Sequence, residues 1–351
     1  MKDKQLIQAL RHAVSWAQQA QPPEPLRGLV TGAKQTIKSL LADIDNRAEF
    51  EDAYEHERML ADTIRVDTYH TAIHKHVKPG DVVVDLGTGT GILAFFAARA
   101  GAKRVYAIDH GDTIEVAEAV AAANGIHTVE FVRANSRDFQ PPEKVDVIVH
   151  EQIGDELFDE NMIENVTDLR DRILRPGGKV LPARFKLFME PIELRKEHAV
   201  PAVWQQELHG IRFDCLKGRP LGPWRNVDPN AAGHSRWIHP LEVSQMLSEP
   251  QAVLEVDLET VERSAAPKNL RFARTIQRVG RFDGLCIYFG VAFDDQLGFD
   301  TSPLSRKTHW GCLLLSFPLR TCQVGDVMTF DIGIGDIREV STWDIRVTHG
   351  S

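Results

Sequence analysis

Two glutamates, Glu151 and Glu160, lie nine positions apart in the run HEQIGDELFDEN, directly after a short apolar segment. A carboxylate offers two acceptor oxygens, which match the fixed fork of donors on a guanidinium in bidentate pairs. A compact ammonium cannot make this planar pairing. The residue types and their spacing therefore predict a clamp for a planar cation, and the guanidinium of arginine is the biological group that fits it.

A glycine-rich turn upstream predicts a second half to this site. The run VVVDLGTGTGIL, from Val82 to Leu93, is typical of an apolar strand that turns tightly into a helix. Glycines in such a turn let the backbone approach a ligand closely. Asp109 ends the next predicted strand, where a carboxylate accepts hydrogen bonds from ribose hydroxyls. We therefore expect a ligand that contains a nucleoside.

The details of the turn favour one nucleoside over another. Gly87, Gly89 and Gly91 form a GxGxG pattern, whereas dinucleotide sites carry GxGxxG, whose last glycine supports helix packing around a pyrophosphate. Asp85, just before the turn, is an acid that would repel a pyrophosphate and suits a cationic amino-acid group. The pattern favours S-adenosylmethionine over NAD.

An alternation of strands and helices must position these residues. Helical segments are predicted at Ile92–Ala100, Thr113–Asn124 and Asn161–Leu174, and apolar strands at Val82–Leu86, Arg104–Asp109, Val129–Arg133, Val145–His150 and from Lys179 onward. This order predicts an α/β domain with a Rossmann-like parallel sheet. The carboxyl ends of parallel strands share one rim, so the glycine turn, Asp109 and Glu151 should meet there.

The rest of the chain differs in pattern. After Pro182, strand-length apolar runs separated by Gly, Pro, Asn and Asp predict an antiparallel β-barrel or sandwich. Helical periodicity is expected in residues 1–46, from Glu51 to Val77, at Trp204–Leu216 and in the run HPLEVSQML. We expect three regions: an N-terminal helical extension (1–46), an S-adenosylmethionine-binding domain (47–181) and a β domain (182–351).

Composition limits the class of protein. The 351 residues carry a formal net charge of −9 and no run of Lys or Arg, which argues against a nucleic-acid partner. No apolar stretch is long enough for a membrane span, and the first residues do not form a secretory signal. The cysteines are scattered without a CxxC pair, so neither a metal site nor a disulfide framework is indicated, and we expect a cytoplasmic protein.

With these motifs in view, the chain resembles the protein arginine methyltransferases from about residue 50 to the C-terminus. The runs HERMLADTIRVDTY, VVVDLGTGTGIL with VYAID, HEQIGDELFDENM and KTHWGC carry the resemblance, in the family's order. It implies methyl transfer from S-adenosylmethionine to arginine in a protein or peptide. It also implies a β-barrel as the second domain and a homodimer with a dimerisation arm around residues 200–240.

The resemblance also implies site residues. It assigns catalysis to Glu151, Glu160, His309 and Asp62. It assigns cofactor binding to Arg65, which would hold the methionine carboxylate, and to Gly87, Gly89, Gly91, Asp109, Asn135 and Ser136. The glycine-turn argument adds Asp85 to this cofactor set. It assigns the substrate side to Met59, Met162, Trp310 and Tyr54.

Several alternatives stay open at this point. The proton released by the guanidinium could pass to Glu160 or to a His309–Asp62 pair. Gln152 and Asp155 stand in the double-glutamate loop where common eukaryotic members have aromatic residues, and Asp155 could bind the α-amino group of free arginine. The alternatives to a peptide methyltransferase are therefore an enzyme for free arginine or another small guanidine, and a non-catalytic cofactor-binding protein.

Overall fold

The computed structural model describes residues 52–199, 207–213, 235–262 and 266–350, together with five isolated earlier residues. These five are all helical: Leu10, Ala13, Ala33, Ile37 and Leu41. The rest of the predicted helical extension, residues 1–46, lies outside the described residues.

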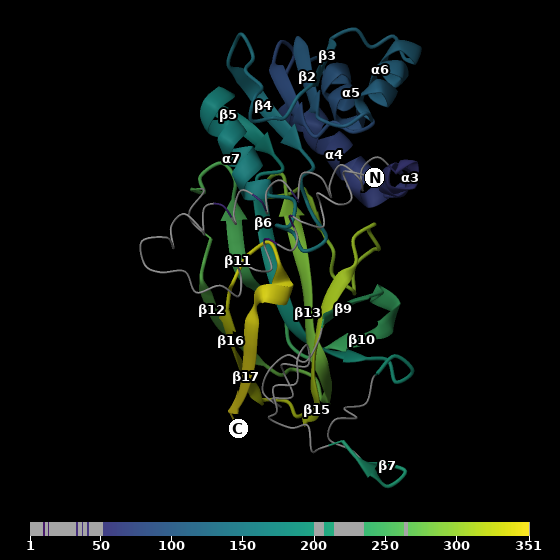
Figure 1. The fold of residues 1–351 in the computed structure, drawn as a ribbon, viewed down its shortest axis with the longest axis vertical. Helices are drawn as coiled ribbons and strands as arrows, with labels where there is room; N and C mark the ends of the chain where they lie inside the picture. Colours follow the sequence, from purple (N-terminus) through teal and green to yellow (C-terminus); the bar gives the residue numbers. More distant parts are fainter. Residues whose placement is uncertain are drawn as a thin grey trace.

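A five-stranded parallel sheet forms the upper part of the molecule in Figure 1. Its strands are β1 (Val82–Leu86), β2 (Arg104–Asp109), β3 (Val129–Arg133), β4 (Val145–His150) and β5 (Leu174–Leu181), in the order β3-β2-β1-β4-β5. The helices between them are α5 (Ile92–Arg99), α6 (Ile114–Ala123) and α7 (Met162–Ile173). The predicted Rossmann-like sheet is confirmed.

The strand order reverses at the centre of this sheet. β1 pairs with β2 on one side and with β4 on the other, and all five of its residues are buried. In an open α/β sheet, ligands bind beyond the carboxyl ends of the strands at such a switch point. The glycine turn follows β1, Asp109 ends β2 and Glu151 follows β4, so all three reach the same rim, as predicted.

The sequence predicted one helical region from Glu51 to Val77. This prediction is wrong in one respect, because the structure has two helices there. α3 (Ala53–Ala61) ends at Asp62, and the same residue caps α4 (Thr63–His76) by accepting a hydrogen bond from the backbone N–H of Arg65 at 3.0 Å. Aspartate is a strong N-cap, since its carboxylate satisfies a free N–H of the first turn. The chain therefore changes direction at Asp62.

Antiparallel sheets form the second half of the chain, below the parallel sheet in Figure 1. The larger sheet contains β6 (Arg184–Leu194), β9 (Ser235–Ile238), β10 (Val243–Met246), β11 (Ala252–Asp257), β13 (Gly280–Ala292), β14 (Gly298–Asp300) and β15 (Cys312–Cys322). A smaller sheet contains β12 (Asn269–Thr275), β16 (Val327–Gly333) and β17 (Asp344–Gly350). The predicted antiparallel β domain is confirmed.

The two antiparallel sheets share one core. The ring of Phe330 on β16 lies 6.4 Å from the rings of Phe282 on β13 and Phe317 on β15, measured between centroids. All three side chains are buried. The sheets therefore face each other, as a barrel-like domain requires. Within the described residues, no helix is both long enough and apolar enough to cross a membrane.

Two helices were predicted in the β domain. Both predictions are wrong at the residues that the structure describes, which form strands and turns. Within Trp204–Leu216, Glu207–Leu208 (β7) and Ile211–Arg212 (β8) form a hairpin. His209 and Gly210 at its turn have φ of 51° and 83°, the combination that a tight hairpin turn needs. The run HPLEVSQML forms a short 3-10 turn and then β10. Its second half is extended because it pairs with β6.

Candidate active site

A cavity opens at the switch point, with about 1220 Å³ of empty space that includes part of the open solvent in front of it. Nine of the residues predicted for the site line it: Met59, Arg65, Gly87, Gly89, Asp109, Asn135, Ser136, Glu151 and Glu160. The remaining seven do not line it: Tyr54, Asp62, Asp85, Gly91, Met162, His309 and Trp310. Both predicted halves of the site, the nucleoside turn and the glutamate pair, thus face one space.

Backbone geometry explains the glycine turn. Gly87 has φ of 72°, and a Cβ there would lie 2.9 Å from the Nε2 atom of Gln152. Asp109 holds the turn, because its carboxylate accepts hydrogen bonds from the N–H groups of Gly89 at 2.9 Å and Gly111 at 2.8 Å. Gly91 has a different function: it caps α5 with φ of 88°, and a Cβ there would collide with Phe95.

Asp85 lies beneath the turn rather than in the cavity. Its Oδ2 accepts hydrogen bonds from the hydroxyl of Thr88 at 2.6 Å and from the N–H of Ala94 at 3.0 Å. Burial raises the pKa of its carboxyl to about 7, against the effect of these two hydrogen bonds. In this structure Asp85 positions the turn and the start of α5.

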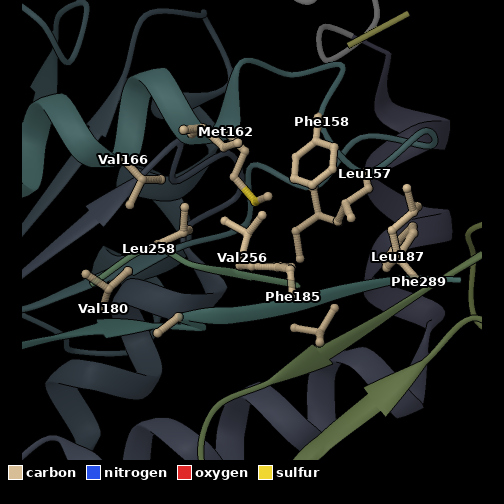
Figure 2. Packing of buried hydrophobic residues seen from close by; sticks show 14 of the residues in the cluster. Leu157, Phe158, Met162, Val166, Val180, Phe185, Leu187, Val256, Leu258 and Phe289 are labelled. Atoms are coloured by element: carbon tan, nitrogen blue, oxygen red, sulfur yellow. The ribbon is translucent and has the colours of Figure 1, made fainter. Parts of the chain in front are cut away.

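The double-glutamate loop is anchored by apolar side chains. Figure 2 shows Leu157, Phe158 and Met162 pointing into a cluster that also contains Phe185 and Leu187 of β6. All five are buried. Met162, predicted on the substrate side, is therefore a core residue, and its burial holds the start of α7 beside Glu160.

Hydrogen bonds from the β domain hold the same loop. The indole N–H of Trp310 donates to the carbonyl of Ile153 at 3.0 Å. The N–H of Val340 donates to Glu156 at 2.7 Å, and Arg338 donates to the side chain of Asn161 at 2.6 Å. Trp310, predicted to contact substrate, thus supports the loop from below.

Asp62 and His309 form the predicted pair at the boundary of the two domains. Asp62 Oδ2 accepts hydrogen bonds from the backbone N–H of His309 at 2.8 Å and from its Nδ1 at 2.9 Å. Burial opposes ionisation of Asp62, yet hydrogen bonds from His309 and Arg65 lower its pKa below the usual value. The pair ties the break between α3 and α4 to the loop before β15.

Arg65 and Glu151 form an ion pair in the cavity wall. Arg65 Nη2 lies 3.0 Å from Glu151 Oε2, and both side chains are 6% exposed. Arg65 Nη1 donates to the carbonyl of Met59 at 2.8 Å. Its Nε is buried and has no hydrogen-bond partner among the described residues. Burial raises the pKa of Glu151, and the charge of Arg65 acts against that rise.

Several lining residues were not predicted for the site, among them His56, Gln152 and Asn165. Asn165 Nδ2 donates to Gln152 Oε1 at 3.0 Å, which joins α7 to the glutamate loop. His56 precedes Met59 by three positions on α3, and helical spacing places both on one face. That spacing could have indicated His56. Tyr54, which was predicted, is 66% exposed.

Comparisons with known proteins agree with this geometry. Residues 37–181 match the family described as ribosomal protein L11 methyltransferase (PrmA), and residues 184–332 match the arginine methyltransferase oligomerization subdomain. Protein arginine N-methyltransferase 6 of Danio rerio is 32% identical over 270 residues, which cover 74% of this chain and 75% of that protein. The chain belongs to the protein arginine N-methyltransferase family. This membership confirms the predicted resemblance and the predicted reaction class, methyl transfer from S-adenosylmethionine.

Solved structures of family members share the fold. Arabidopsis thaliana protein arginine methyltransferase 10 superposes with a TM-score of 0.69 at 25% identity, over 86% of this chain and 94% of that one. The Trypanosoma brucei PRMT1 enzyme-prozyme heterotetrameric complex with AdoHcy superposes with a TM-score of 0.70 at 24% identity, over the same shares. The two-domain architecture of this methyltransferase is therefore that of the family.

Proposed function

We propose that this methyltransferase transfers a methyl group from S-adenosylmethionine to a guanidino nitrogen of arginine in a protein or peptide. The observation that carries the proposal is that Glu151 and Glu160 line the same cavity as the glycine turn and Asp109. A clamp for a planar cation thus faces a site suited to a nucleoside. Membership of the arginine methyltransferase family supports this substrate.

Residues that line the cavity fit the cofactor. Arg65 offers a buried Nε donor with no partner in the described structure, which suits the carboxylate of the methionine portion. Asp109 would accept hydrogen bonds from the ribose, and Asn135 and Ser136 would lie along the adenine. When bound there, S-adenosylmethionine supplies an electrophilic methyl group on a sulfonium.

The two glutamates would make the guanidinium a better nucleophile. A guanidinium is protonated at neutral pH and its electron density is delocalised, so it is a poor nucleophile by itself. Glu151 and Glu160 can hold the positive charge on the nitrogens that do not react. Alignment of the reacting nitrogen with the methyl group contributes several of the ~7–11 kcal/mol that ideal positioning can supply.

Glu160 is the better candidate to accept the proton that the nitrogen loses. It lines the cavity, whereas neither His309 nor Asp62 does. The Asp62 carboxylate is already occupied by three donors, from Arg65 and from the backbone and ring of His309. A general base must come within hydrogen-bond reach of the proton that it takes. We therefore assign the His309–Asp62 pair to positioning.

A peptidyl arginine is favoured over free arginine. The free amino acid would need an acid near the clamp for its α-amino group, and Asp155 was the candidate. Asp155 is exposed and is not among the residues that line the cavity. Incubation of the enzyme with S-adenosylmethionine and either free arginine or arginine-rich peptides, followed by mass spectrometry, separates the two substrates. Methylation of free arginine alone would contradict the proposal.

Glu151→Gln and Glu160→Gln test the clamp directly. Each change removes one negative charge at nearly constant size, so turnover should fall sharply or vanish, while cofactor affinity stays within a few-fold. Methyl transfer from labelled cofactor gives the turnover, and calorimetry with S-adenosylhomocysteine gives the affinity.

A surface glutamate provides the control for this test. Glu143, which lies 3.8 Å from Lys103 on the surface, is not among the cavity-lining residues, and Glu143→Gln should leave turnover unchanged. Unchanged turnover in either clamp variant would remove the glutamate pair from the mechanism and favour a protein that only binds the cofactor.

We also propose that the enzyme is a homodimer located in the cytoplasm. The match of residues 184–332 to an oligomerization subdomain supports the dimer. Cys286, Cys312 and Cys322 are free and buried, which suits a reducing compartment.

A further inference from the structure

Arg65 contacts both halves of the cavity. Its Nη2 pairs with Glu151 Oε2 at 3.0 Å, and its unpartnered Nε is the donor that suits the cofactor carboxylate. The guanidinium cannot swing away freely, because Nη1 donates to the carbonyl of Met59 at 2.8 Å. The backbone N–H of Arg65 is also held by Asp62. Arg65 is thus a rigid element shared by the cofactor end and the substrate end.

Glu151 depends on a positive neighbour to stay ionised. Its side chain is 6% exposed, and a carboxylate removed from water favours the protonated form. Arg65 on α4 faces it directly, and His309 on the loop before β15 also acts on it. Tyr69 and Asp85 also interact with it and Glu160 lines the same cavity, but none of these three groups can supply a positive charge.

We propose that Arg65 keeps Glu151 charged and oriented for the substrate guanidinium, in addition to any contact that Arg65 makes with the cofactor. Arg65 is then a positioning residue for the clamp. This inference rests on the proposed function for its meaning, because a protonated Glu151 could not pair with a cation. The charge state of Glu151 itself can be measured without methyl transfer.

Two substitutions at position 65 separate the charge of the side chain from its shape. With Arg65→Gln, Glu151 should hold its proton at higher pH, and the apparent pKa should rise by about 1 to 3 units, the usual effect of a lost opposite charge nearby. Arg65→Lys keeps a point charge without the planar fork. It should restore most of the ionisation of Glu151, while cofactor affinity stays below that of the unaltered enzyme.

Infrared titration of the whole protein measures this charge directly. A buried, protonated carboxyl gives its own C=O band, and loss of that band in Glu151→Gln assigns it. We expect no Glu151 band in the unaltered enzyme at pH 7, a band that persists to higher pH in Arg65→Gln than in the unaltered enzyme, and a return to the unaltered pattern in Arg65→Lys. Arg346→Gln, which breaks the exposed Arg346–Asp344 pair, is the control and should change nothing.

The pH dependence of turnover gives a second, kinetic readout of the charge on Glu151. At saturating cofactor, the acid limb of the pH profile of kcat/KM for the peptide should move to higher pH in Arg65→Gln, in the same direction as the infrared titration. A protonated Glu151 at pH 7 in the unaltered enzyme, or a Glu151 titration in Arg65→Gln that coincides with that of the unaltered enzyme, would overturn the inference. If the infrared result holds and Glu151→Gln still methylates at full rate, the proposed function fails instead.

Discussion

Asp85 lies on a strand whose residues are all buried, so its carboxyl is kept from water. Thr88 and Ala94 donate to one of its oxygens, and the other has no partner in the described part of the chain. The sequence indicated an acid beside the glycine turn and predicted contact with the cofactor. The packing of α5 on the sheet, which no sequence pattern shows, places this carboxylate beneath the glycine turn.

Asp85 should make the enzyme less stable as pH rises. Its pKa is about 7 in the folded protein and 3.8 in a model peptide, so the folded state binds the proton more tightly. The resulting stabilisation is complete below pH 3.8 and is lost as pH rises through about 7. In Asp85→Asn, the fall in unfolding free energy between pH 5 and 8 should shrink by about 2–3 kcal/mol.

Thermal unfolding at several pH values checks this expectation. Val324→Asn, at an exposed turn, serves as a control that should keep the original pH dependence. An Asp85→Asn variant that loses as much stability as the unaltered enzyme would show that Asp85 is already ionised when folded.

At the scale of elements, the double-glutamate loop is built by both domains. It starts at the end of β4 and ends at α7, and Trp310 and Arg338 bind it from the β domain. Its acids were recognised from sequence because their spacing is local. Its supports could not be recognised, since Trp310 lies 157 positions away from Ile153 along the chain.

Trp310→Phe should loosen this loop while keeping an aromatic ring in the core. Loss of the indole N–H leaves the Ile153 carbonyl without its buried donor, which costs about 1–3 kcal/mol. We expect kcat to fall about tenfold with little change in cofactor affinity. Steady-state kinetics and calorimetry measure the two quantities.

A second tryptophan provides the comparison. Trp237 on β9 is 46% exposed, and Trp237→Phe should leave kcat within about twofold, since exposed substitutions usually change little. A fall in cofactor affinity with unchanged kcat in Trp310→Phe would contradict the role of Trp310 as a support for the loop.

At the scale of the whole molecule, the β7–β8 hairpin lies at the lower end in Figure 1, far from the parallel sheet. Leu208 and Ile211 expose 40% and 63% of their surface there. A partner that covers exposed apolar side chains at such a tip would stabilise the assembly. The hairpin lies within residues 200–240, where the resemblance implies a dimerisation arm.

The enzyme should therefore be a dimer that depends on this hairpin. Light scattering at micromolar concentration should give twice the mass of one chain, and the double change Leu208→Asp with Ile211→Asp should give a monomer. Val324→Asp adds the same charge at another exposed apolar site, in the turn after β15, and should leave the dimer intact. A monomeric unaltered protein would contradict the proposed homodimer.

The sequence alone determined the alternation of strands and helices, the rim on which the site lies and the two glutamates, because each depends on short-range patterns of apolar residues, glycines and acids. Tertiary structure decided which candidates face the cavity. Met162, Trp310 and His309 carry motif signatures, yet packing between the two domains turns them into supports. The pairing of Arg65 with Glu151 was also decided there, since burial and contact between residues 86 positions apart leave no local pattern in a sequence.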